Sequence, residues 1–77
     1  MSAFPYAIVT SYEDATRNLE QMREQGVTGI EVPVMGLGDL TRNFEQIQKL
    51  LNISLPHVPP ESFLDVTHNF ETLEANG

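Results

Sequence analysis

Two histidines are the side chains of this sequence that can gain or lose a proton near neutral pH. His57 lies in the proline-rich stretch 55–60, between an apolar segment and the expected start of a helix. A histidine at such a position could act as a general base. However, no second catalytic group stands at a recognisable spacing from it, and a loop histidine held between prolines explains the same pattern. We therefore assign no catalytic residue, and the chain is interpreted as non-enzymatic.

A second set of candidates depends on the fold. If strands and helices alternate, the residues that follow each strand gather at one edge of a sheet, where helix N-termini can bind an anion. Asp14, Asp39 and Asp65 would repel an anion from these first turns, so helix capping is the stronger explanation. The candidate ligand edge consists of Ser11, Gly36, Gly38, His57 and Ser62.

The C-terminal third has an unusual charge pattern. From Leu50 to Gly77 the chain has four acidic residues and no lysine or arginine. Such an asymmetry suits a docking surface for a partner protein with a basic surface, although plain solvation of the surface is the stronger explanation of the charges. The candidate partner-binding residues are Glu61, Asp65, Glu71 and Glu74.

The composition excludes several classes of protein. The chain has 77 residues, 11 acidic against 4 basic, with a formal net charge of −7 and no cysteine. This length allows one domain, and the negative charge argues against nucleic-acid binding. Without cysteine, neither disulfides nor a usual Cys/His zinc site can form, and we predict no metal site and no cofactor. No signal peptide or apolar run of ~18 residues is visible, so we expect a cytoplasmic protein that does not bind membranes.

An internal repeat organises the chain. Residues 14–22 recur as residues 39–47 with six of nine positions identical, and residues 39–47 recur as 65–73 with five of nine identical. We interpret the chain as a single domain, 1–77, with three repeats of about 25 residues near 5–26, 30–51 and 53–76. His68 takes the repeat position of Arg17 and Arg42, opposite the apolar stripe, and is expected at the solvated surface.

Each repeat predicts one helix. Apolar residues follow the spacing i, i+3, i+7, i+10 in all three copies, which forms one stripe along a helix. Ser11 and Ser62 each precede an aspartate by three positions, which is a helix-start signal. Gly26 and Asn52 mark helix ends. The expected helices therefore span about 12–25, 37–51 and 62–75.

The segments between these helices are apolar and β-branched, and residues 30–34 and 53–56 alternate between apolar and other residues. This period of two is typical of strands. The expected order is therefore β-α-β-α-β-α, an α/β fold with a small, mostly parallel sheet and helices mainly on one face. The alternative is an all-α repeat array, in which these segments are extended linkers.

Two local resemblances accompany this pattern. The stretch 4–33, with the ending Gly26-Val27-x-x-Ile30-Glu31-Val32-Pro33, resembles a strand-helix-strand unit of a TIM-barrel enzyme. A chain of this length cannot close such a barrel, which needs about 200 residues or more. The apolar spacing over residues 47–58 is similar to one leucine-rich repeat, without its expected asparagine. Neither resemblance transfers functional residues.

Three functional hypotheses remain open. The preferred one is a small acidic protein-binding or regulatory module that associates with itself to cover an open sheet, or with a basic protein partner. The second is an oligomeric small-molecule-binding protein or enzyme that uses the βα-loop edge around His57. The third is an engineered or minimal repeat protein without a natural partner, which the high identity between the repeats would suit.

Overall fold

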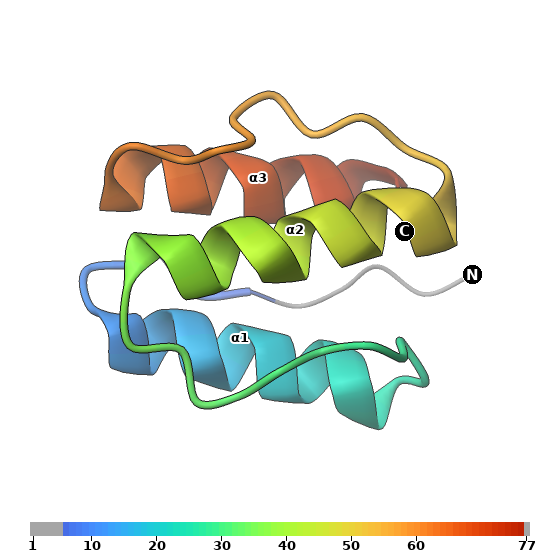
Figure 1. Cartoon of the computed structure of the whole chain (residues 1–77), viewed down its shortest axis with the longest axis horizontal. Coiled ribbons are helices and arrows are strands. Elements are labelled where there is room, and N and C mark those ends of the chain that lie inside the picture. The colour runs from blue at the N-terminus through green and yellow to red at the C-terminus, as the bar shows by residue number, and fades with distance from the viewer. Residues whose placement is uncertain (1–5, 77) are drawn as a thin grey trace.

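The computed structural model describes residues 6–76, and within that range the chain forms three α-helices and no β-strand. Helix α1 spans Tyr12–Glu24, α2 spans Leu37–Leu51 and α3 spans Phe63–Asn76. All of them run in the same direction, and extended segments return from the end of one helix to the start of the next (Figure 1). The predicted α/β class is therefore wrong, and the all-α alternative agrees with the structure. The expected repeat start at residue 5 lies outside the described residues.

The helix ends follow the signals in the sequence. The Ser11 hydroxyl accepts a hydrogen bond from the Asp14 N–H (3.2 Å), and Ser62 accepts one from the Asp65 N–H (3.3 Å). Gly36 precedes α2 and has no side chain that could do the same. Asn52 adopts the left-handed conformation (φ 56°) directly after α2, as expected for a helix end.

The apolar stripes of the helices form the core. Phe44 and Phe70 pack edge-to-face with their ring centroids 5.4 Å apart, which is a favoured aromatic geometry. Every residue of the stripes from the second position onward is buried, with at most 2 % of its surface exposed. These residues are Ala15, Leu19 and Met22 in α1, Leu40, Phe44 and Ile47 in α2, and Val66, Phe70 and Leu73 in α3.

One buried asparagine in each helix binds the extended segment that precedes that helix. Its side-chain oxygen accepts from the backbone N–H of one residue, and its side-chain nitrogen donates to the C=O of the same residue, at 2.8–3.0 Å. A primary amide offers the same donor and acceptor as a peptide group, so it takes the place of a neighbouring strand. We call these contacts asparagine clamps. The pairs are Asn18 with Ala7, Asn43 with Glu31, and Asn69 with His57.

The clamps explain why the strand prediction failed. In the second segment Ile30 and Val32 are half-buried and Val34 is buried, whereas Glu31 and Pro33 are exposed, so the alternation in the sequence is real. Alternation indicates that one side of an extended segment is buried. It does not indicate whether the backbone of that segment forms hydrogen bonds with a strand or with a helix. Here the partner is a helix. The strand-helix-strand unit expected from the TIM-barrel resemblance is therefore absent from residues 6–33.

Threonine hydroxyls connect neighbouring repeats. The Val9 N–H donates to Thr67 Oγ1 of α3 (2.9 Å), and the Val34 N–H donates to Thr16 Oγ1 of α1 (3.1 Å). These threonines occupy equivalent repeat positions, and so do the two valines. The first two extended segments are thus each held by their own helix through an asparagine and by another helix through a threonine.

The third equivalent contact is missing for a chemical reason. The residue of the third segment that corresponds to Val9 and Val34 is Pro60, which has no N–H to donate. Thr41, the corresponding threonine of α2, instead donates to the Leu37 C=O of its own helix (2.9 Å). The fold therefore has two threonine connections between repeats where an unbroken pattern would have three.

Candidate functional site

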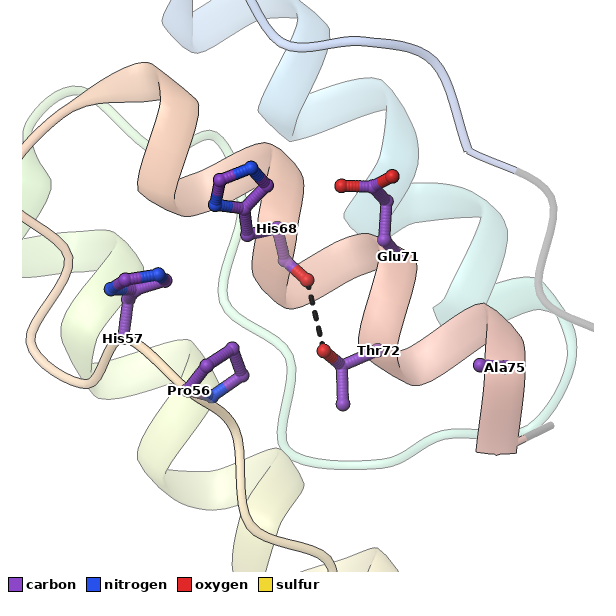
Figure 2. A pocket seen from close by; sticks show the side chains of 6 residues that line it. All are labelled: Pro56, His57, His68, Glu71, Thr72 and Ala75. Atoms are coloured by element: carbon purple, nitrogen blue, oxygen red, sulfur yellow. Dashed lines mark hydrogen bonds between the residues drawn. The ribbon is translucent and has the colours of Figure 1, made fainter.

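A surface hollow of about 420 Å³ lies between α3 and the extended segment before it. Figure 2 shows His57 and Pro56 on that segment, and His68 with residues further along α3. The two imidazole rings lie next to each other, with their centroids 5.5 Å apart and their planes tilted by 32°. The hollow is lined by Pro56, His57, His68, Glu71, Thr72 and Ala75.

The asparagine clamp fixes His57 at this hollow. Its backbone N–H and C=O both bind the Asn69 side chain, at 3.0 and 2.8 Å. Because Asn69 is fully buried, this backbone cannot shift without breaking two hydrogen bonds in the interior. The His57 ring is held over α3 as a result, with Nδ1 at 3.5 Å from Asp65 Oδ1.

Asp65 has one oxygen already in use and one facing the histidine. Its Oδ2 accepts from the Glu61 backbone N–H (2.9 Å). Asp14 and Asp39 hold the equivalent N–H groups of Thr10 and Met35 in the same way. For both of those aspartates this backbone hydrogen bond is the main reason that the carboxyl pKa lies below its usual value.

The residue that pairs with the aspartate at this repeat position (Asp14, Asp39 or Asp65) differs between the repeats. Arg17 pairs with Asp14 (2.6 Å), and Arg42 pairs with Asp39. In the third repeat the arginine position holds His68, which lies at the surface as predicted but is half-buried and next to His57. Donor atoms of His57, Asp65 and His68 all lie within 4.8 Å of one another.

The sequence analysis missed this group of three. Asp65 and His68 are three positions apart on one helix, so their proximity was visible in the sequence. The position of His57 next to them depends on the clamp with Asn69, and no periodic pattern in the sequence predicts that clamp. The one available signal was the histidine that replaces arginine three residues after Asp65.

The candidate ligand edge does not form as expected. Among the described residues there is no sheet, and hence no βα-loop edge around His57. Ser11, Gly36 and Ser62 each stand directly before a helix, and the helix starts lie at one end of the molecule (Figure 1). His57 is not among them: it lines the hollow beside α3, whereas Ser62 lines a second hollow of about 260 Å³. Gly38 is exposed in the first turn of α2.

The acidic residues of the C-terminal third lie on and next to α3. Glu61 and Glu71 are exposed, and Asp65 and Glu74 are half-buried. Partial burial raises the pKa of the Tyr6 phenol, and the negative charges of Glu71 and Glu74 raise it further. Tyr6 therefore lies near Glu71 and Glu74, and its phenol stays protonated at neutral pH.

No helix within residues 6–76 combines the length and the apolar character needed to cross a membrane. The chain matches no protein-family model, and comparisons with curated proteins and with solved structures also give no match.

Proposed function

We propose that this chain is a small, non-enzymatic cytoplasmic module that docks a basic segment of a partner protein on the acidic face of α3. The acidic face consists of Glu61, Asp65, Glu71 and Glu74, together with the hollow that Glu71 lines. The observation that carries the proposal is the coincidence of this hollow with the part of the chain that has no lysine or arginine.

The distribution of charge over the helices supports a cationic ligand at this face. Every basic residue of the sequence belongs to α1 or α2: Arg17, Arg23, Arg42 and Lys49. Of these, Arg17 and Arg42 are paired with aspartates of their own helices. All charged side chains of α3 and of the segment before it are therefore acidic apart from the histidines, and such a charge distribution attracts basic segments and speeds their association.

The hollow supplies the second requirement, a place for a side chain to enter. Its wall combines the Glu71 carboxylate with the apolar surfaces of Pro56 and Ala75. A lysine or arginine side chain has a matching structure, because an aliphatic stem carries its charge. The stem would lie along Pro56 and Ala75, and the charged end would meet Glu71.

The test is fluorescence anisotropy with a labelled oligolysine peptide and the double variant Glu71→Lys/Glu74→Lys. The matched control is Glu20→Lys/Glu45→Lys, which has the same net charge. Glu20 and Glu45 occupy the repeat position of Glu71 in α1 and α2. We expect the α3 variant to lose binding and the control to keep most of it. An equal loss in both variants would show that only net charge matters, and would refute the acidic face as the docking site.

Self-association is a second proposal, favoured by a different observation. The reason expected from the sequence, an uncovered sheet, does not apply, because residues 6–76 form no sheet. However, Met35 and Leu64 are 78 % and 63 % exposed next to the starts of α2 and α3. The hollow at this end is lined by Tyr12, Leu37, Ser62 and Phe63. Light scattering over a tenfold concentration range tests this, and a mass of 8.6 kDa throughout would refute it.

A further inference from the structure

We infer that His57, Asp65 and His68 form a binding site for a divalent transition-metal ion, of which Zn²⁺ is the best match. We call these residues the His-Asp-His site. The site shares Asp65 with the acidic face, but the inference does not depend on the docking of a basic partner, because its tests change the two histidines and leave Glu71 and Glu74 in place.

The distances bring the three donors within reach of one ion. All of them lie within 4.8 Å of one another, and His57 Nδ1 is 3.5 Å from Asp65 Oδ1. Ligand bonds of about 2.0–2.2 Å place the donors of a tetrahedral zinc ion ~3.3 Å apart. The His57–Asp65 pair is already near this separation. Rotation of the half-buried His68 ring supplies the rest, since it needs a movement of roughly 1–1.5 Å.

The donors are also anchored from outside the site. Asp65 Oδ2 is held by the Glu61 N–H, which leaves Oδ1 directed to His57. His57 is held through its backbone by Asn69. Metal sites depend on such supporting hydrogen bonds, because they orient the ligands before the ion arrives and so reduce the entropy lost on binding.

Comparison of the repeats gives an independent argument. In α1 and α2 the aspartate of this position is neutralised by an arginine three residues later. In α3 the arginine is replaced by His68, and the clamped residue is His57 where the other repeats have Ala7 and Glu31. Both histidines of the chain thus stand at the one aspartate that has no arginine partner. A cation bound there supplies the positive charge that an arginine supplies in the other two repeats.

The donor set selects the kind of ion. Calcium and magnesium prefer oxygen ligands, whereas imidazole suits zinc, copper, iron and nickel. Two histidines and one carboxylate are a known set for zinc, with water at the fourth position. The open side of the hollow gives that water access to solvent.

The experiment titrates tag-free protein with ZnCl₂ at neutral pH, followed by calorimetry and by NMR of the imidazole protons. Since the chain has two histidines, each ring signal can be assigned by substitution. We expect both rings to shift together and to saturate at one equivalent of zinc. At about 100 times the dissociation constant, zinc should raise the melting temperature by about 10–20 °C.

The decisive variant is His68→Arg, because it restores the arginine of the other repeats and should fold without zinc. We expect it to lose the calorimetric signal and the thermal shift. The matched control is the double variant Arg17→His/His68→Arg. It places one histidine beside Asp14, where the clamped residue is Ala7 and supplies no second imidazole, so we expect this variant to bind no zinc. Full zinc binding by His68→Arg, or a shift of one ring alone in the parent, would overturn the inference.

A transplanted site tests the geometry in the other direction. In the His68→Arg background, Glu31→His with Arg42→His places two histidines around Asp39 at the positions of His57 and His68. We expect this triple variant to regain one equivalent of zinc binding. If it folds and binds no zinc, the clamp position and the arginine position are insufficient to build the site, and the assignment fails.

Discussion

The threonine connections between repeats predict a specific pattern of stability. Thr67→Val removes the hydroxyl that accepts from the Val9 N–H, while it keeps the shape of the side chain. Thr67 and Val9 are 6 % and 3 % exposed, so water cannot replace the lost acceptor. A buried N–H left without a partner costs about 1–3 kcal/mol. For a chain of this length the total stability is about 4–12 kcal/mol, so the variant should lose a substantial part of it.

The same substitution at Thr41 is the internal control. Its hydroxyl donates to Leu37 C=O within α2, and the residue opposite, Pro60, has no N–H to leave unpaired. We expect Thr41→Val to change the unfolding free energy by less than about 0.5 kcal/mol. Thermal unfolding followed by circular dichroism should show a drop of about 4–20 °C for Thr67→Val. Equal effects of the two substitutions would refute the proposed role of the connections.

Two further predictions concern the clamps and the aspartates. Asn43→Ala removes three hydrogen bonds, two to Glu31 and one to the Asp39 C=O, and should cost about 2–4 kcal/mol in urea unfolding; a loss below about 0.5 kcal/mol would contradict the clamp. The hydrogen bond from the Met35 N–H lowers the pKa of Asp39 in the folded chain, so its contribution to stability is present above the ordinary pKa of an unfolded aspartate, about 3.9, and is lost as the pH falls through the lower folded value. Melting temperatures measured from pH 7 to strong acid should therefore fall less steeply for Asp39→Asn than for the parent, and parallel curves would exclude this linkage.

The helices could be predicted from the sequence because their signals are local. An apolar stripe needs only the helical period, and a cap needs only residues within one turn of each other. The expected 12–25, 37–51 and 62–75 differ by at most one residue at each end from the observed helices. Ser11 and Ser62 bind the expected N–H groups.

The extended segments were misread because their partners are distant in the sequence. Ala7 and Asn18 are 11 residues apart, and Val9 and Thr67 are 58 apart. Repeated asparagines on the flank of an apolar stripe were visible in the sequence. However, the sequence looks the same whether such an asparagine binds an extended segment in the interior or is exposed to solvent. The decisive information is burial: Asn18, Asn43 and Asn69 are at most 2 % exposed.

The candidate site can be understood from which positions of the repeat the fold constrains and which it leaves free to vary. The buried asparagine of each repeat binds the backbone N–H and C=O of one residue, so replacing it removes the partner of both a donor and an acceptor. The arginine position is less constrained, because Arg17 and Arg42 are exposed and an exposed ion pair contributes little to the stability of the fold. The side chain of the clamped residue is equally free, since only its backbone is held. The third repeat therefore changes both free positions to histidine while the asparagine still fixes where they meet. A scaffold that binds its extended segments through their backbone can thus vary the chemistry on its surface without altering its core, and α3 is where this chain has done so.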